Sequence, residues 1–308
     1  MPRFSIVLPA YNAEPFIQQT IGSILSQTYQ DFEIIVVDDG SSDATGAVAA
    51  AMDPRVRVLK QRNSGIALAR NAGIGAARAD WIAFMDHDDL WHPQKLAVQA
   101  ETLERDTTCA IVYGEFKRWD PSTPPQFNSE TLEASQVDAA LSGSILHRLV
   151  QTNWVLLSTA VIRKQVFEKV GLFDPKMPPA DDWDLMMRAA EHFRFVKLAQ
   201  QVALYRVHRG QTSLKLTATN IEYELRLRGL ARLRTLGGPS IDRQDINSRQ
   251  FRALWNYGLA QYKAGLYRQS CPSFFGALRY NKVSGKAAAY LVMAYMRSIT
   301  QTAGSDKI

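Results

Sequence analysis

Three aspartates crowd into four residues directly after an apolar run. The segment FMDHDDLWHP at 84–93 places Asp86, Asp88 and Asp89 at the end of a strand-like stretch. Like charges this close repel one another, and one carboxylate would be enough to cap a following helix. Hard oxygen ligands favour Mg²⁺ or Mn²⁺, which shares its remaining coordination with phosphate oxygens. The cluster therefore predicts such a metal beside a nucleoside diphosphate, with a capped helix and solvated loop as the structural alternative.

A second acidic turn, Asp38-Asp39-Gly40-Ser41, follows another β-rich run. No basic residue accompanies its carboxylates, which favours recognition of a nucleobase N–H or a ribose hydroxyl over recognition of phosphate. Asp-Gly-Ser is also a good turn by itself, so a purely structural role stays open.

A third acidic group, Asp181-Asp182-Trp183-Asp184, opens a helix. Acids in a first turn complement the helix dipole, which is the structural explanation. Three acids exceed that need, and Trp183 is of the type that stacks on a sugar ring. A carboxylate near such a ring is suited to be the general base for an alcohol.

Two nitrogen-bearing side chains are further candidates. Arg70 lies on an Ala-rich helical stretch, and a guanidinium there can bind phosphate in a site rich in carboxylates. His208 follows the last predicted strand and is a candidate for a metal or phosphate contact. A solvent-facing Arg and a structural His are the alternatives.

The apolar pattern predicts the elements that carry these residues. Continuous apolar strands that alternate with helices imply an α/β fold with a mostly parallel sheet covered by helices on both faces. Strands are predicted at 3–9, 32–37, 56–59, 81–85, 110–119, 155–162 and 202–207. Helices are predicted at 14–25, from about 43, at 65–79, from 93 to about 105, and at 136–149, 164–170 and 183–192.

Charge divides the 308 residues unequally. Of the net +6, residues 1–214 contribute −4 (21 Lys and Arg against 25 Asp and Glu) and 215–308 contribute +10 (15 against 5). Strand signals also stop near 214, so we predict an α/β domain at 1–214 and a smaller all-α region at 215–308. Within the latter, the pattern at 255–281 predicts a helical hairpin similar to a tetratricopeptide unit, with an ordinary hairpin packed on the main domain as the alternative. The charge pattern of this region favours an anionic partner such as membrane lipid, nucleic acid or an acidic protein, with a solvated helical face as the alternative.

Composition limits the class and location of the protein. Apolar residues at 46% and charged residues at 21% are typical of globular chains and exclude a wholly disordered one. Only Cys109 and Cys271 are present, which favours a reducing compartment. The N-terminus lacks a signal-peptide pattern, so we expect a cytoplasmic protein. If the protein associates with a membrane, we expect it to do so peripherally, at the cytoplasmic face. P-loop, dinucleotide-binding, serine-hydrolase and zinc-protease motifs are absent from the sequence.

Read in order, these segments resemble the inverting glycosyltransferases of family 2, whose GT-A fold is a Rossmann-like, mostly parallel sheet. The resemblance covers residues 3–213. It is carried by SIVLPAYNAEPFIQQTIGSILSQTY, FEIIVVDDGSSDAT, NSGIALARNAGI, WIAFMDHDDLWHP, VGLFDP, DDWDLMMR and YRVH. Any one of these motifs is weak, and their fixed order is what makes the match specific.

The resemblance implies a role for each site residue. Asp182 matches the family's catalytic base, with Asp181 where Glu is usual, and Asp181 and Trp183 would line the acceptor or sugar pocket. Asp88 matches the direct metal ligand, and Asp86 would lie towards the ribose or the metal. We add His208 as a metal contact because of its place after the last predicted strand. The residues implied to bind the nucleotide are Pro9, Ala10, Tyr11, Asp39, Arg70 and Asp86.

The implied reaction is a Mn²⁺- or Mg²⁺-dependent, inverting transfer of one sugar. The donor is a nucleotide-diphosphate sugar, most commonly UDP-linked, and the acceptor is a hydroxyl of a glycan or lipid-linked molecule in cell-surface polysaccharide synthesis. A nucleotidyltransferase is one alternative, but LPAYNAEP lacks the Gly-rich basic loop it would need. A catalytically inactive nucleotide-sugar-binding or scaffold protein that acts through the basic tail is the other. Nucleic acid is not an expected partner.

Overall fold

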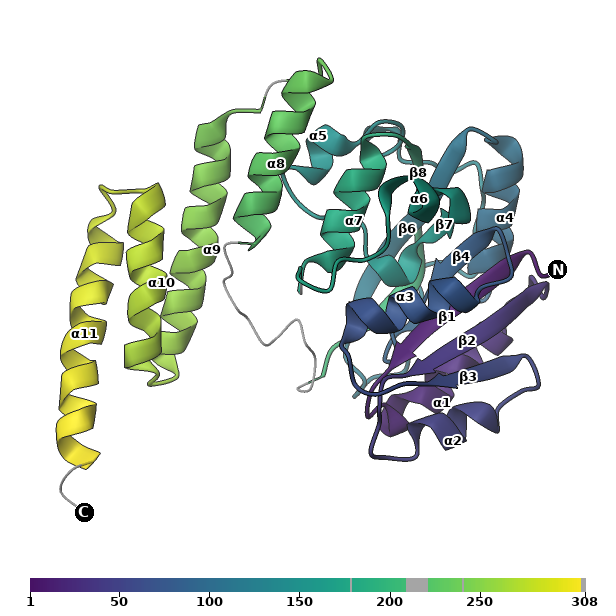
Figure 1. The fold of residues 1–308 in the computed structure, drawn as a ribbon, viewed down its shortest axis with the longest axis horizontal. Coiled ribbons are helices and arrows are strands. Elements are labelled where there is room, and N and C mark those ends of the chain that lie inside the picture. The colour runs from purple at the N-terminus through teal and green to yellow at the C-terminus, as the bar shows by residue number, and fades with distance from the viewer. Residues whose placement is uncertain (178, 209–220, 240, 306–308) are drawn as a thin grey trace. The chain divides into compact units, whose positions relative to one another are not determined.

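The computed structural model describes residues 1–177, 179–208, 221–239 and 241–305. The chain divides into two compact units, Met1–Gln211 and Thr212–Ile308 (Figure 1). The domain boundary predicted near residue 214 lies outside the described residues.

The first unit contains one sheet of eight strands in the order β3-β2-β1-β4-β7-β6-β8-β5. β1 to β4 pair in parallel with one another, and β6 is parallel to β8, whereas β7 and β5 are antiparallel to their neighbours. The predicted mostly parallel sheet is therefore confirmed, and the short strands β5 and β7 are its antiparallel members. The strands are β1 (Phe4–Ala10), β2 (Phe32–Asp38), β3 (Val56–Lys60), β4 (Trp81–Phe84), β5 (Leu90–Trp91), β6 (Cys109–Trp119), β7 (Val161–Arg163) and β8 (Arg194–Arg206).

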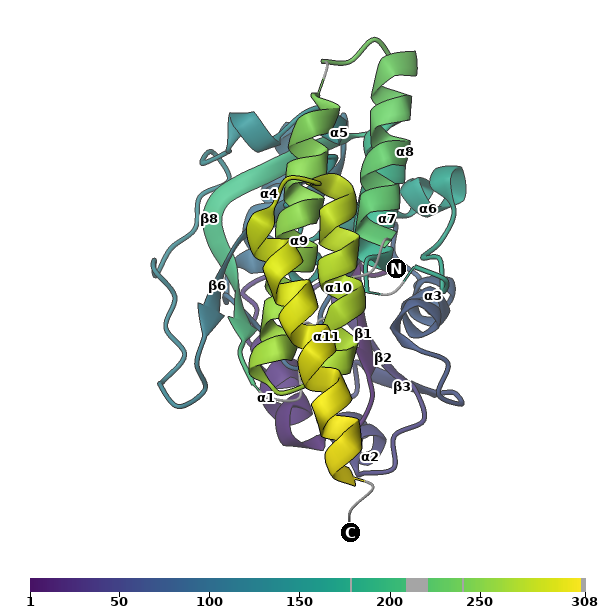
Figure 2. The same cartoon turned by 90° about the vertical axis from the view of Figure 1, so that its left-hand side faces the viewer.

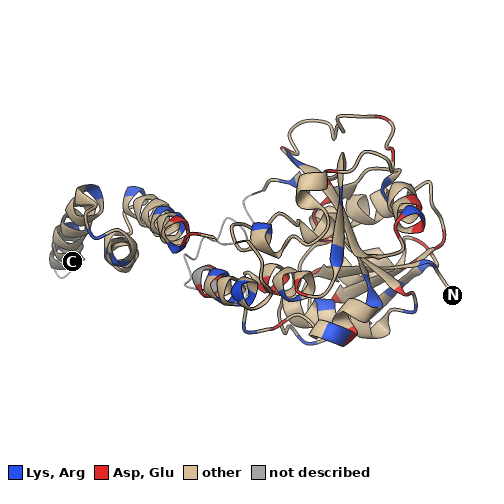
Figure 3. Ribbon diagram, turned by 90° about the horizontal axis from the view of Figure 1, so that it is seen from above, with Lys and Arg blue, Asp and Glu red and all other residues tan. Residues whose placement is uncertain are grey.

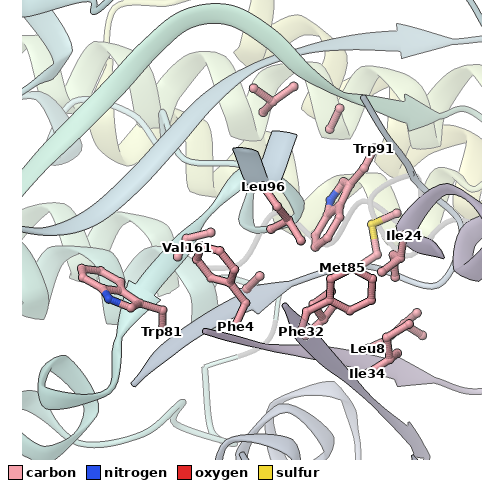
Figure 4. Close-up of a cluster of buried hydrophobic side chains, with 14 of the residues drawn as sticks. Phe4, Leu8, Ile24, Phe32, Ile34, Trp81, Met85, Trp91, Leu96 and Val161 are labelled. Carbon is pink, nitrogen blue, oxygen red and sulfur yellow. The ribbon is translucent and has the colours of Figure 1, made fainter. Parts of the chain in front are cut away.

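Helices cover both faces of this sheet, because side chains along each strand point alternately to opposite sides. In β1, Phe4 and Leu8 belong to a core cluster with α1, α2 and α4 on one face (Figure 4). Val7 points to the other face, where a Cβ on Gly73 of α3 would overlap its side chain. The helices of this unit are α1 (Glu14–Leu25), α2 (Thr45–Ala50), α3 (Ile66–Ala76), α4 (Lys95–Arg105), α5 (Leu146–Leu149), α6 (Lys164–Val170) and α7 (Asp181–Ala190).

Two predicted elements are wrong. The helix predicted at 136–149 is a 3-10 turn at Ala139–Leu141 followed by the short α5, and Gly143 between them has φ +84°. The strand predicted at 155–162 is mostly a 3-10 turn at Leu157–Thr159 ahead of the three-residue β7. In both segments apolar residues suggested regular structure where the chain instead turns.

In the second unit, the described residues form helices joined by short turns. α9 and α11 both pack on α10, side by side (Figure 2). Gly265 (φ +76°) ends the first arm of the hairpin predicted at 255–281, and Gly258 lets Phe274 approach the backbone of α9. Over the described residues, no helix is long and apolar enough to cross a bilayer. The helices are α8 (Ile221–Thr235), α9 (Arg243–Lys263), α10 (Tyr267–Tyr280) and α11 (Gly285–Ser305).

Candidate active site

The loops after β1 and β2 are tied together at the carboxyl edge of the sheet. Asn12 adopts φ +48°, a conformation that Asn tolerates better than most residues. Its side-chain oxygen accepts the backbone N–H of Ser42 at 2.9 Å, and its own N–H donates to Ser41 Oγ at 3.0 Å. Tyr11, next to it, keeps 48% of its surface exposed, whereas Pro9 and Ala10 are buried in β1. Tyr11 is therefore the accessible aromatic ring of this loop.

Asp39 holds the segment that leads into α3. Its buried carboxylate accepts hydrogen bonds from Gln61 Nε2 at 2.7 Å and from the backbone N–H groups of Ser64 and Gly65 at 2.9 Å each. Its own N–H donates to the carbonyl of Ala10 at 2.8 Å. Asp39 thus fixes the loop around the site, and most of its hydrogen-bonding capacity is used within the protein.

Arg70 joins two of the predicted acidic groups. From α3 its Nη1 donates to Asp181 Oδ2 at 2.9 Å and its Nη2 to Asp86 Oδ1 at 3.0 Å. Burial lowers the pKa of Arg70, but Asp86, Asp181 and Asp182 outweigh this effect and raise it overall. The guanidinium is thus a buried cation that brings the end of β4 to the start of α7.

Asp182 lies beside this ion-pair network and is partly buried. Its Oδ1 accepts the backbone N–H of Trp183 at 2.6 Å, and Asn153 Nδ2 lies 3.4 Å from its Oδ2. Burial, and next the charge of Asp181, raise the pKa of Asp182 to about 7, although Arg70 opposes the shift. A carboxyl group with this pKa can take up a proton near neutral pH.

Asp88 and His208 meet at the same edge. His208 Nε2 lies 2.9 Å from Asp88 Oδ2, and the imidazole packs against the Phe16 ring at a tilt of 45°, with ring centroids 4.5 Å apart. Asp86 is held by its backbone N–H, which donates to Ser158 Oγ at 3.2 Å. Among the described residues no three acid, His or Cys side chains form a cluster of metal-site geometry. A carboxylate and an imidazole side by side are of the types that bind a divalent cation, which would need further ligands such as the oxygens of a diphosphate.

Arg206 organises the Asp86–Asp89 turn, a role that sequence reasoning missed. Its Nε donates to the carbonyl of Asp88 at 2.5 Å, its backbone N–H to Asp89 Oδ1 at 3.1 Å and its Nη2 to Gln19 Oε1 at 2.8 Å. Burial, with the charges of Asp86 and Asp88, raises the pKa of the Asp89 carboxyl well above its usual value. A signal for this role was present in the segment YRVH at 205–208, because Arg206 lies two residues before the candidate ligand His208 and its side chain could hold the end of the strand in place.

The structure buries the side chain of Trp183. Only 4% of its surface is exposed, and its indole N–H donates to the carbonyl of Leu149 at 2.8 Å. The ring packs in the interior of the unit because it lies on the inner side of α7, so the predicted stacking wall for a sugar is not formed by Trp183. Trp154, 44% exposed and next to Asn153, is the tryptophan near Asp182 that is open to solvent.

The loop before α7 is anchored from two sides. Arg188 pairs with Asp184 at 2.8 Å and donates to the carbonyl of Leu172 at 2.9 Å. Asn71 on α3 both donates to the carbonyl of Phe173 at 2.9 Å and accepts its N–H at 3.0 Å. Asp184 therefore has a structural role, whereas Asp181 and Asp182 face Arg70.

Comparison with known proteins places this chain in a family. The model of glycosyl transferase family 2 matches residues 5–169. An uncharacterized glycosyltransferase of Bacillus subtilis, EpsJ, is 34% identical over 232 residues, which are 73% of this chain and 65% of that protein. The chain thus spans slightly less than two thirds of that relative.

Solved structures share the fold. TarS of S. aureus in complex with UDP-GlcNAc aligns with a TM-score of 0.61 at 16% identity, covering 99% of this chain and 92% of that one. The mannosyltransferase PcManGT of Pyrobaculum calidifontis with GDP-Man and Mn2+ aligns with a TM-score of 0.57 at 19% identity, covering 97% and 81%. The expected GT-A fold is confirmed, and the chain belongs to glycosyl transferase family 2.

Proposed function

We propose that this glycosyltransferase moves one sugar from a nucleotide-diphosphate sugar to an acceptor hydroxyl with inversion at the anomeric carbon. The observation that carries the proposal is the position of Asp182. Its carboxyl group lies next to the Arg70–Asp86–Asp181 network, and its pKa is raised to about 7. A single carboxylate base beside the donor end of the site fits one direct displacement rather than a covalent intermediate.

Asp182 would act on the acceptor. Its Oδ2, opposite Asn153, is the oxygen we assign to take the proton of the attacking hydroxyl. Arg70 would hold Asp181 and Asp86 in place. Its positive charge would also limit the rise in the pKa of Asp182, because a nearby cation favours the ionised carboxylate. Asn153 and Trp154 would contact the acceptor in the place first assigned to Trp183.

The donor side would use the loops after β1, β2 and β4. Tyr11 would stack on the nucleobase, and Asp39 would accept a hydrogen bond from a nucleobase N–H. The backbone of Pro9 and Ala10 would line the nucleotide-binding site. Asp88 and His208, with Asp86 near the ribose, would hold Mn²⁺ or Mg²⁺, which when bound neutralises the departing diphosphate. UDP is the nucleotide we favour, and relatives of the same fold bind UDP-GlcNAc and GDP-Man.

The acceptor is proposed to be a glycan or lipid-linked molecule of cell-surface polysaccharide synthesis. The basic region 215–308 supports this, because its charge of +10 suits the anionic cytoplasmic surface of a membrane where such acceptors are held. The enzyme would then be peripheral to that membrane.

Calorimetric titration tests the donor site. UDP and GDP are titrated into the wild type and Asp88→Ala, each with and without Mn²⁺. We expect metal-dependent binding of UDP that is lost in the variant. A wild type that binds neither nucleotide contradicts the proposal, and one that binds UDP but transfers no sugar from any UDP-sugar to water or acceptor supports an inactive binding protein instead.

A further inference from the structure

The outward face of α11 is apolar. The opposite face packs on α10 through the fully buried Ala287 and Ala294. Large apolar side chains recur at helical spacing on the outward face and are more than isolated surface residues, so they mark an interaction surface. Its most exposed members are Val292 (61%), Tyr295 (61%), Met296 (60%) and Ile299 (49%).

The surrounding helices carry uncompensated positive charge. Between Ile246 and Ser305 the sequence contains no Asp or Glu. Seen from above, α10 and α11 accordingly show blue and tan but no red (Figure 3). The basic residues of this stretch are Arg249, Arg252, Lys263, Arg268, Arg279, Lys282, Lys286 and Arg297.

Part of this charge gathers where α11 begins. Arg279, Lys282 and Lys286 are exposed around the turn between α10 and α11. Val283, in the same turn, exposes 91% of its surface, and Arg279 stacks over the ring of Phe275 at 5.3 Å. A basic turn with exposed apolar side chains thus leads directly into the apolar face.

We propose that this outward face of α11, with the basic turn that precedes it, docks on an anionic lipid bilayer. The inference rests on the membrane association proposed above and names the surface responsible. Apolar side chains on one helix face enter the boundary between headgroups and acyl chains, while Lys and Arg beside them attract lipid phosphates. Neither interaction requires the helix to cross the membrane.

Two other occupants fit this surface less well. A second copy of the chain would bring the same acid-free, basic surface against itself, because a two-fold interface uses the same patch twice. A nucleic acid is bound mainly by cations and aromatic rings, whereas Val292, Met296 and Ile299 are neither and Tyr295 is the one aromatic residue among the four most exposed members of this face.

Flotation of the full chain tests the proposal. The probes are vesicles of phosphatidylcholine alone and of phosphatidylcholine with phosphatidylglycerol. The wild type is expected to float only with the anionic vesicles. The double variant Val292→Glu, Met296→Glu should bind at least about tenfold more weakly, since both positions are exposed and lose an apolar contact with lipid. Lys282→Gln with Lys286→Gln should weaken binding at low salt by about thirtyfold.

The matched control is Val137→Glu with Leu172→Glu, which makes the same change in net charge at exposed apolar positions of the first unit. It should float as the wild type does. The inference is overturned if the α11 double variant floats as the wild type does, or if the wild type does not bind the anionic vesicles. It is also overturned if, in the absence of lipid, the wild type forms a dimer that the α11 substitutions disrupt, or if the wild type binds poly(U) more tightly than vesicles. The nucleotide titration reports separately on the active site, so either proposal can fail alone.

Discussion

Asp88 Oδ2 and His208 Nε2 are 2.9 Å apart although 120 residues separate them in the chain. β8 makes this meeting possible, because it ends at Arg206, whose side chain and backbone grip the turn that carries Asp88. The Asp88–His208 pair therefore depends on β8, which lies next to the edge strand β5 and four places from β1 in the sheet.

A double-mutant cycle tests whether the pair acts as one unit. Asp88→Asn and His208→Ala are each expected to weaken Mn²⁺-dependent UDP binding by about 10- to 100-fold, and the double variant by little more than either alone. Calorimetry measures all four proteins. His192→Ala, at an exposed histidine of the same unit, should bind as the wild type does. Fully additive losses would show that the two side chains bind independently.

The raised pKa of Asp182 predicts an acid limb in the pH profile. Below about pH 7 the carboxyl group is protonated and cannot accept a proton, so kcat/KM should fall about tenfold per pH unit. Above this pH the carboxylate predominates and the rate should level off. Sugar transfer at subsaturating donor measures the profile.

Asp182→Asn should lower the rate by about 10²- to 10⁴-fold without changing the UDP affinity more than a few-fold. Asp120→Asn, in an exposed loop, is the control and should leave both unchanged. A wild-type profile that is flat down to pH 5 would show that a different group removes the proton.

Removing the Arg70 cation should destabilise the fold. Arg70→Met leaves Asp86 and Asp181 without their shared partner, and breaking a buried ion pair from one side costs about 3–5 kcal/mol. Arg105→Met removes an exposed pair with Glu101 and should cost below about 1 kcal/mol. Urea unfolding measures both. Equal losses would mean that the Arg70 network adds no more than a surface pair.

Two glycines of α3 should respond oppositely to alanine. Gly73→Ala forces a methyl group into Val7 of β1 and should destabilise by about 1–3 kcal/mol. Gly75 is exposed with no atom near its missing Cβ, so Gly75→Ala should stabilise by about 0.5–1 kcal/mol through helix propensity. Thermal unfolding compares them. If Gly73→Ala were neutral, α3 would not be packed against β1 as closely as described.

The alternation of apolar strands and helices predicted most of the first unit, since β1 to β4 and α1 to α4 each have a continuous local signal. β8 was harder, because its first eight residues contain Lys197, Gln200 and Gln201, and only pairing with β6 makes it a strand. The helix predicted at 136–149 failed for the converse reason, as its apolar residues serve tertiary contacts on both sides of Gly143.

The candidate site shows the same limit. The sequence identified the acids because clustered charge is visible in one dimension. It did not show that Arg70 would pair with Asp86 and Asp181, that Arg206 would hold the Asp88 turn, or that Trp183 would be buried. Each of these follows from contacts between distant segments, which no local pattern contains.

The pairing of β6 with β8 has a consequence for how the chain is made. It joins Cys109 to Arg194 and Trp119 to Arg206, so the 11 residues of β6 leave the ribosome long before their partner does. Contacts this distant in sequence form slowly, and an unpaired strand edge attracts other chains meanwhile. The strand that leads to His208 thus leaves one edge of β6 without its partner, and open to pairing with other chains, until residue 206 has emerged from the ribosome.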